Sequence, residues 1–280
     1  MNNPSFYSKQ HQIGRVGSTD VIQRYFYLVK QNKRKESTII DIGSGPGNVI
    51  HDVLIPHFKS PVRKVVGIDV SEEMVKFANA TYGNEKFNFE VWNIENVVPK
   101  RYISFFDYVF SFSTFHWIKD QRKLFLNINR IMKPNAQMLF SFVAQTNLFD
   151  IYQSVWRRPE YAPYIDDFYA GQSCFQKSKE PLKEFQTIIE NAGFKIEMIK
   201  MEVNTAKNKS LVDFKEFLIS LSPYYHKMPD HLKENFMLHH LEQVQRDTRV
   251  ESPNNYYMKF NYIIAYAKKK EIVENKAMLY

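Results

Sequence analysis

Three of the nine glycines in this 280-residue chain fall within five consecutive positions, at Gly43, Gly45 and Gly47. At average usage a chain of this length would hold roughly 20 glycines, so backbone freedom is scarce and concentrated in one segment. The cluster follows a short β-branched run at residues 38–42 and precedes a helix-compatible stretch at 48–58. Because glycine allows positive φ and close approach of a ligand to the backbone, this pattern predicts a ligand-binding loop between a strand and a helix.

Strand-like and helix-like segments alternate along the rest of the chain. Further strands are predicted at residues 65–70, 87–92, 106–112, 138–143, 194–203 and 257–267. Helices are predicted at residues 20–31, 71–83, 118–132, 178–191, 211–221 and 230–246. Strands separated by helices predict an α/β fold, with a parallel sheet covered on both faces.

We expect residues 1–280 to form a single domain. The predicted parts are an N-terminal arm and helix (1–36), a ligand-binding half (37–145), helical cap insertions (146–177 and 204–250) and a mobile tail (271–280). The first insertion is rich in aromatic residues: Phe149, Tyr152, Trp156, Tyr161, Tyr164, Phe168 and Tyr169. Such a run suits a lipophilic pocket, but aromatic residues at helical spacing are more often ordinary core.

Composition excludes several classes of protein. With 44% hydrophobic and 24% charged residues the chain is globular, which excludes disordered and collagen-like chains. A single cysteine, Cys174, cannot form an intramolecular disulfide, and we find neither a signal peptide nor a membrane-spanning run. We therefore expect a cytoplasmic protein without stable membrane insertion. The net charge of +8 permits an acidic partner without identifying one.

The residues around the glycines restrict the ligand. A dinucleotide-binding loop, G-x-G-x-x-G, would need a third glycine where Asn48 stands. Asp41, two residues before the first glycine, would repel a pyrophosphate but suits the ammonium and sulfonium charges of S-adenosylmethionine. Asp69, at the tip of the second strand, can accept hydrogen bonds from ribose hydroxyls, although it would do so for NAD as well. The loop therefore favours a methyl donor over a dinucleotide.

Three other residues are candidates for contacts with the adenine ring. Met74 can pack against adenine or belong to the core. Asn93 and Ile94 follow the third strand, where they can meet the adenine edge, although Asn93 also suits a turn.

Three segments resemble the juvenile hormone acid methyltransferase family. They are Asp69-Val70-Ser71-Glu72-Glu73-Met74 with the residues that follow to Asn79, Phe106 to Gln121 with its His116-Trp117-Ile118-Lys119-Asp120-Gln121 string, and Lys259-Phe260-Asn261-Tyr262. The resemblance implies a class I methyltransferase fold, which is Rossmann-like with a doubly wound, mostly parallel seven-stranded sheet. It also implies S-adenosyl-L-methionine as donor and methyl esterification of a lipophilic sesquiterpenoid acid, such as farnesoic acid or juvenile hormone acid.

The resemblance assigns roles to individual residues. By the resemblance, the glycine loop, Asp41 and Asp69 would hold the cofactor. The full predicted cofactor site comprises Asp41, Gly43, Gly45, Gly47, Asp69, Val70, Met74, Asn93, Ile94 and Ser111. Asn93 departs from the family, which usually has Asp there. Trp117 and His116 would position the acceptor carboxylate. An N-terminal glutamine of the family corresponds to Gln12 or Gln10, although the spacing to Asp20 is shifted by a few residues; Gln12 is our assignment.

A carboxylic acid acceptor needs no general base, because its pKa of about 4–5 leaves it ionised at neutral pH. In-line positioning and desolvation then suffice, and Trp117, His116 and a glutamine amide are donors for the second oxygen. His116 also suits a core or loop position, and Trp117 a core anchor. No H-E-x-x-H motif or Cys–His cluster is present, so we predict no metal site.

The chain lacks the motifs of two rival functions. A nucleic-acid methyltransferase would need an Asn/Asp-Pro-Pro-aromatic or Pro-Cys motif where residues 111–116 stand, so we expect no nucleic-acid partner. An NAD-dependent oxidoreductase is disfavoured by Asp41 and Asn48. A methyltransferase acting on a different acid or another acceptor, and a non-catalytic cofactor-binding paralogue, stay open, as does the oligomeric state.

Overall fold

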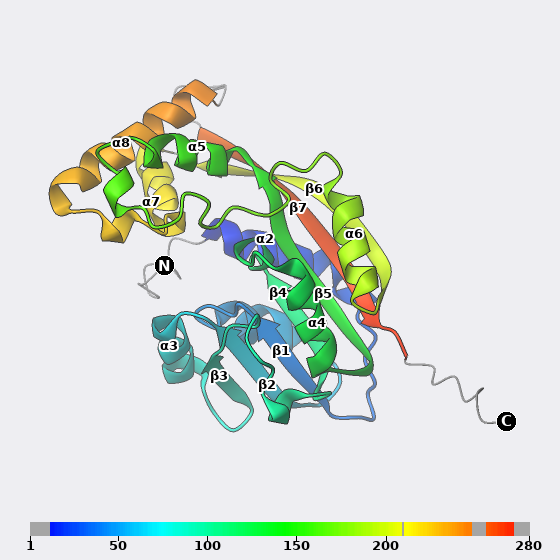
Figure 1. Ribbon diagram of the computed structural model, residues 1–280. Coiled ribbons are helices and arrows are strands. Elements are labelled where there is room, and N and C mark those ends of the chain that lie inside the picture. Colours follow the sequence, from blue (N-terminus) through cyan, green and yellow to red (C-terminus); the bar gives the residue numbers. More distant parts are fainter. Residues whose placement is uncertain (1–11, 209, 248–255, 272–280) are drawn as a thin grey trace.

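The computed structural model describes residues 12–208, 210–247 and 256–271, which build one seven-stranded sheet with helices around it (Figure 1). The strands are β1 (Ser37–Ile42), β2 (Val62–Asp69), β3 (Phe87–Val91), β4 (Phe106–Phe112), β5 (Met132–Thr146), β6 (Phe194–Asn208) and β7 (Tyr256–Lys269). They lie in the order β3-β2-β1-β4-β5-β7-β6. Only β7 is antiparallel to its neighbours β5 and β6. This confirms the predicted doubly wound, mostly parallel α/β sheet.

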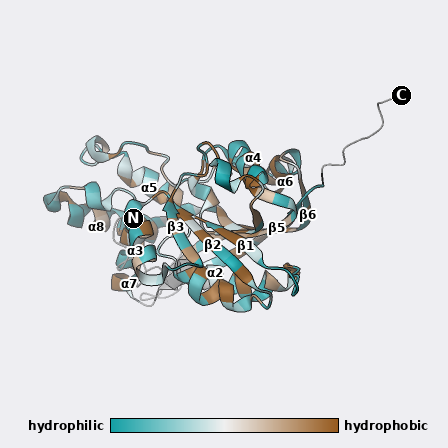
Figure 2. Cartoon of the chain, turned by 90° about the horizontal axis from the view of Figure 1, so that it is seen from below, coloured by the Kyte–Doolittle hydropathy of each residue, from teal (hydrophilic) through white to brown (hydrophobic). Residues whose placement is uncertain are grey.

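Two apolar layers cover the faces of this sheet (Figure 2). Helix α2 (Gln12–Tyr25), a π-helical turn η2 (Val49–Leu54) and helix α3 (Glu72–Tyr82) lie on one face. Helices α4 (Gln121–Ile131) and α6 (Pro181–Asn191) lie on the other. Every residue of β1 is buried, as expected for a central parallel strand covered on both faces.

A third apolar cluster forms a helical cap at one end of the sheet (Figure 1). It joins α5 (Asn147–Trp156), α7 (Leu211–Leu221) and α8 (Asp230–Asp247) to the ends of β5 and β7. Because β1, β4 and β5 are mutually parallel, their carboxyl ends all face this cap. Within the described residues, no helix combines the length and apolar character needed to cross a bilayer.

The aromatic residues of the first insertion mostly form the core of this cap. Phe149, Tyr152, Trp156 and Tyr161 are all buried. Tyr152 stacks on Trp156 with ring centroids 5.0 Å apart, while Tyr164 and Phe168 pack against the cluster from its margin. Tyr169 is 54% exposed. Core packing, the simpler of the two interpretations, therefore accounts for the four buried rings.

Several helices begin or end at other residues than predicted, in part because glycine and proline are weak guides to helix ends. Helix α2 covers residues 12–25 rather than 20–31, because Gly14 and Gly17 lower helix propensity and made the segment resemble an arm. Helix α4 begins at Gln121, where the Asp120 side chain accepts from Lys123 N. It ends at Ile131 without help from Pro134, which lies inside β5. Residues 48–58 form η2 followed by the 3₁₀ turn η3 (Ile55–His57). Gln10 and residues 272–280 of the predicted tail lie outside the described residues.

Lys269 fastens the last strand to the end of α4. Its Nζ donates to Asn129 O at 2.7 Å and to Met132 O at 2.8 Å, and burial lowers the pKa of its ammonium. These carbonyls belong to the negative end of the helix, which a cation stabilises. The link holds the antiparallel edge of the sheet on the α4 layer.

Replacing Lys269 with Met should therefore lower the free energy of unfolding by about 1–3 kcal/mol, the usual loss when buried carbonyls lose their donor. Lys268→Met is the matched control. The Lys268 ammonium lies 3.9 Å from Glu197 at the surface, so its removal should change stability by less than about 0.5 kcal/mol. Urea unfolding of both variants measures the difference, and equal losses would contradict the role of Lys269.

Candidate functional site

The glycine loop lies at the carboxyl end of β1 and is tied to the tip of β2. Gly43 N and Ser44 N donate to Ile68 O at 2.8 and 3.0 Å. The Asp69 carboxylate accepts from Gly45 N at 2.9 Å through Oδ2 and from Ser71 N at 2.9 Å through Oδ1. One side chain thus joins the loop to the start of α3, where Ser71 caps the helix by accepting from Met74 N.

The three glycines all have positive φ, but a side chain at each would meet different surroundings. At Gly43 (φ +74°) a Cβ would lie 2.1 Å from Thr114 Oγ1, and at Gly47 (φ +83°) 2.8 Å from the Phe89 ring. At Gly45 (φ +52°) a Cβ would meet no atom within 4 Å. Gly43 and Gly47 therefore permit tight packing within the protein, whereas Gly45 borders open space.

The Asp41 carboxyl group lies near the glycine loop and has one oxygen without a hydrogen-bond partner among the described residues. It is 3% exposed, at the position of β1 that pairs with Gly67 of β2 and Phe110 of β4. Its Oδ1 is buried and makes no hydrogen bond to any residue that the structure describes. Burial, together with the nearby Asp69 charge, raises the pKa of Asp41 well above its ordinary value. A buried carboxylate with a free oxygen is completed by a hydrogen-bonding cation.

Asp69 adds a second carboxylate to this place. Partial burial raises its pKa, and the hydrogen bonds from Ser71 N and Gly45 N counteract that shift in part. Each carboxylate oxygen can accept two hydrogen bonds, so Asp69 retains capacity for a ligand hydroxyl. The residues present thus fit a ligand that is cationic at one end and carries hydroxyls, as S-adenosylmethionine does.

The other residues predicted for the cofactor occupy varied positions. Val70 is 69% exposed beside Asp69, and Met74 is buried in α3. Asn93 forms a turn, its Oδ1 accepting from Glu95 N at 2.9 Å. Ile94 is buried, and Ser111 Oγ, also buried, donates to Ile42 O at 2.8 Å. The Ser111 bond ties the tip of β4 to that of β1.

The predicted acceptor residues follow β4. His116 and Trp117 lie in the 3₁₀ turn η5 (Phe115–Trp117), with His116 buried and Trp117 half-buried. The Trp117 ring lies against Gly171 (φ +72°), where a Cβ would be 2.4 Å away. Lys119 also forms an ion pair with Asp167, which lies four residues before Gly171. Gln12 is the first residue of α2, and its side chain lies outside the described part.

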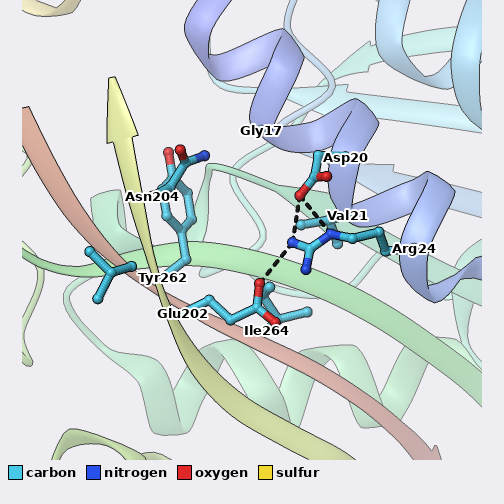
Figure 3. Close-up of a pocket in the computed structure, with 9 residues that line it drawn as sticks. Gly17, Asp20, Val21, Arg24, Glu202, Asn204, Tyr262 and Ile264 are labelled. Atoms are coloured by element: carbon cyan, nitrogen blue, oxygen red, sulfur yellow. Dashed lines mark hydrogen bonds and ion pairs between the residues drawn. The ribbon is translucent and has the colours of Figure 1, made fainter. Parts of the chain in front are cut away.

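The structure also contains a cavity that sequence reasoning missed. It measures about 390 Å³ and lies between α2 and the β6–β7 pair, with Asn204 and Tyr262 in its wall (Figure 3). Tyr262 belongs to a segment that carries the family resemblance, but no sequence pattern brings it next to Gly17. Across the described ranges, no group of three or more His, Cys, Asp or Glu residues is placed to hold a metal ion.

Comparisons with known proteins agree with this geometry. A family model described as a methyltransferase domain matches residues 33–193, more than half of the chain. Juvenile hormone acid O-methyltransferase of Bombyx mori is 28% identical, over 96% of this chain and 98% of its own length. The enzyme of that name from Drosophila melanogaster is 26% identical, over 98% and 95%.

A solved structure shows the same fold. The YcgJ protein of Bacillus subtilis superposes with a TM-score of 0.58 at 17% identity, covering 90% of this chain and 99% of that one. The matched segment includes the glycine loop, Asp41 and Asp69, where the geometry fits the methyl donor. The chain therefore belongs to the class I methyltransferase family, whose cofactor is S-adenosylmethionine.

Proposed function

We propose that this protein methylates the carboxylate of a lipophilic acid of the sesquiterpenoid class, such as farnesoic acid or juvenile hormone acid. The observation that carries the proposal is the similarity to two juvenile hormone acid O-methyltransferases over nearly the whole of both chains. The similarity extends through the cap and β7, beyond the domain common to methyltransferases. The cytoplasmic location expected from the sequence belongs to this proposal.

The donor would lie over the glycine loop. Asp41 Oδ1 would accept a hydrogen bond from the ammonium group of the methyl donor, and Asp69 would accept from its ribose hydroxyls. The open space beside Gly45 would let the ligand lie close to the backbone. Two carboxylates at this place disfavour a pyrophosphate and favour a cation. When bound, S-adenosylmethionine supplies an electrophilic methyl group, and its transfer to a carboxylate leaves a neutral thioether and a neutral ester with no proton to move.

The acceptor side would consist of positioning groups. The acid is already ionised at neutral pH, so this chain needs to hold and desolvate it rather than deprotonate it. His116 and Trp117 lie at the carboxyl end of β4, next to Thr114, which contacts Gly43 of the loop. Groups held there would help to orient the carboxylate so that one oxygen faces the methyl group.

An acid panel tests the reaction. The purified protein, incubated with methyl-labelled donor, should esterify farnesoic acid and juvenile hormone acid, with kcat/KM falling for short or strongly polar acids, because the apolar chain supplies binding energy. Labelled ester extracted into organic solvent is the readout, and calorimetry confirms that donor binds. Donor binding without any ester would refute the proposal and indicate another acceptor or a non-catalytic paralogue.

A substitution at Gly45 tests where the donor binds. Asparagine tolerates left-handed φ, so Gly45→Asn should preserve the loop while its side chain enters the open space. We expect donor affinity to fall at least roughly tenfold in calorimetry, with little change in thermal unfolding. Gly47→Ala is the contrasting variant, because its Cβ would clash with Phe89 and lower the unfolding temperature. Unchanged donor affinity in Gly45→Asn would place the donor elsewhere.

The pH dependence of donor binding tests Asp41. Its raised pKa means that the free protein holds a proton on this carboxyl above the ordinary Asp range. A cation requires the ionised form, so donor affinity should rise with pH above the ordinary Asp range, for as long as the donor amino group stays charged. Asp41→Asn should flatten this rise and weaken binding roughly tenfold or more, as expected for a charged hydrogen bond of about 1.5–3 kcal/mol. A wild-type pH profile retained by the variant would exclude Asp41 from the donor site.

A further inference from the structure

The cavity beside α2 has the size of a binding site for one small molecule. Its volume of about 390 Å³ lies within the range of about 300–1,000 Å³ that is usual for such sites. One face of α2 forms one wall, and β6 and β7 form the other (Figure 3). Val21 and Ile264 supply apolar surface, whereas the Val203 side chain is 64% exposed on the opposite face of β6.

Two neutral hydrogen-bond donors converge at one end of this cavity. Tyr262 pairs with Glu202 across β6 and β7, so Asn204 lies on the same face one diagonal step away. Their side chains point together toward Gly17 of α2 (Figure 3). Asn204 Nδ2 and Tyr262 Oη would each lie 3.8 Å from a Cβ on Gly17. A side chain at position 17 would thus be in van der Waals contact with both hydrogen-bond donors.

The Tyr262 hydroxyl also connects this end of the cavity to the methyl-transfer site. Burial raises its pKa to about 12, so it keeps its proton at neutral pH. It faces the side chain of Ser113, the residue that follows β4. Ser113 Oγ is buried. The next residue, Thr114, packs on Gly43. Ser113 and Thr114 therefore lie between the glycine loop and the hydrogen-bond donors Asn204 and Tyr262.

The charged residues at the other end of the cavity satisfy one another. Arg24 donates to Asp20 Oδ2 and to Glu202 Oε2, the latter at 2.7 Å. Lys200 Nζ lies 3.3 Å from Glu202 Oε1. Partial burial raises the pKa of Glu202, but the hydrogen bonds from Arg24 and Tyr25 outweigh it and bring the pKa to about 2. The cations Arg24 and Lys200 thus balance the carboxylates of Asp20 and Glu202. The neutral hydrogen-bond donors Asn204 and Tyr262 then determine which ligand binds.

We propose that this cavity receives the acceptor acid, an inference that rests on the proposed function. The Tyr262 hydroxyl and the Asn204 amide donate to the carboxylate oxygen that does not attack, and the hydrocarbon chain lies along Val21 and Ile264. Neutral hydrogen-bond donors suit the carboxylate because they bind the anion without a positive charge that would compete with the cationic methyl donor for it. The end of the cavity nearest Ser113 and the glycine loop is where the carboxylate must lie to meet the methyl group.

Calorimetric titration of farnesoic acid into the protein loaded with S-adenosylhomocysteine tests this site without requiring turnover. Tyr262→Phe and Asn204→Leu each remove one donor, and each should weaken acid binding roughly tenfold. Gly17→Phe fills the cavity from α2 and should abolish acid binding. All three should bind S-adenosylhomocysteine as the wild type does, within about twofold. In turnover, Tyr262→Phe should raise KM for the acid more than it lowers kcat.

Tyr266→Phe is the matched control, because it removes a tyrosine hydroxyl from the same strand at the opposite end, where it donates to Gln137 Oε1 at 2.6 Å. Its acid binding should equal that of the wild type. Acid binding unaffected by Tyr262→Phe, Asn204→Leu and Gly17→Phe, or absent from the wild type, overturns the cavity assignment. Acid that binds through these residues but is never esterified supports the assignment and refutes the proposed reaction instead.

Discussion

One carboxylate, Asp69, sets the geometry of the site. It accepts backbone N–H groups from Gly45 and Ser71, so the glycine loop, the tip of β2 and the start of α3 take one fixed arrangement. The Ser111 hydroxyl bonded to Ile42 O adds the tip of β4 to this assembly. The turn that carries His116 and Trp117 starts from there. A side chain that bonds two backbone segments holds both in place, as the positioning of two reactants requires.

The charge at the site follows from the same arrangement. The Asp69 charge contributes to the raised pKa of Asp41, and burial raises the pKa of both carboxyl groups. Such a pair disfavours anions and is completed by a cation, which distinguishes this loop from a pyrophosphate-binding loop at the same place in a related sheet. The proposed carboxylate acceptor would be held by neutral hydrogen-bond donors, and the wall of the α2 cavity supplies two.

The sequence predicts local features well and long-range ones poorly. Strands and caps depend on neighbouring residues, so the strand at residues 106–112 and the Ser71 cap appear as expected. The functions of Gly43 and Gly47 depend on Thr114 and Phe89, which are distant in sequence. The start of α2 was missed because two glycines lower its helix propensity. The cavity joins residue 17 to residues 204 and 262, a juxtaposition that only the fold creates.

A crystal structure of the protein with S-adenosylhomocysteine and farnesoic acid would locate both ligands at once. We expect the amino group of the cofactor product within about 3 Å of Asp41 Oδ1, its ribose on Asp69 and the rest of the molecule beside Gly45. We also expect the acid carboxylate between Asn204 and Tyr262. A cofactor product bound away from Asp41 and Gly45 would contradict this placement of the methyl donor.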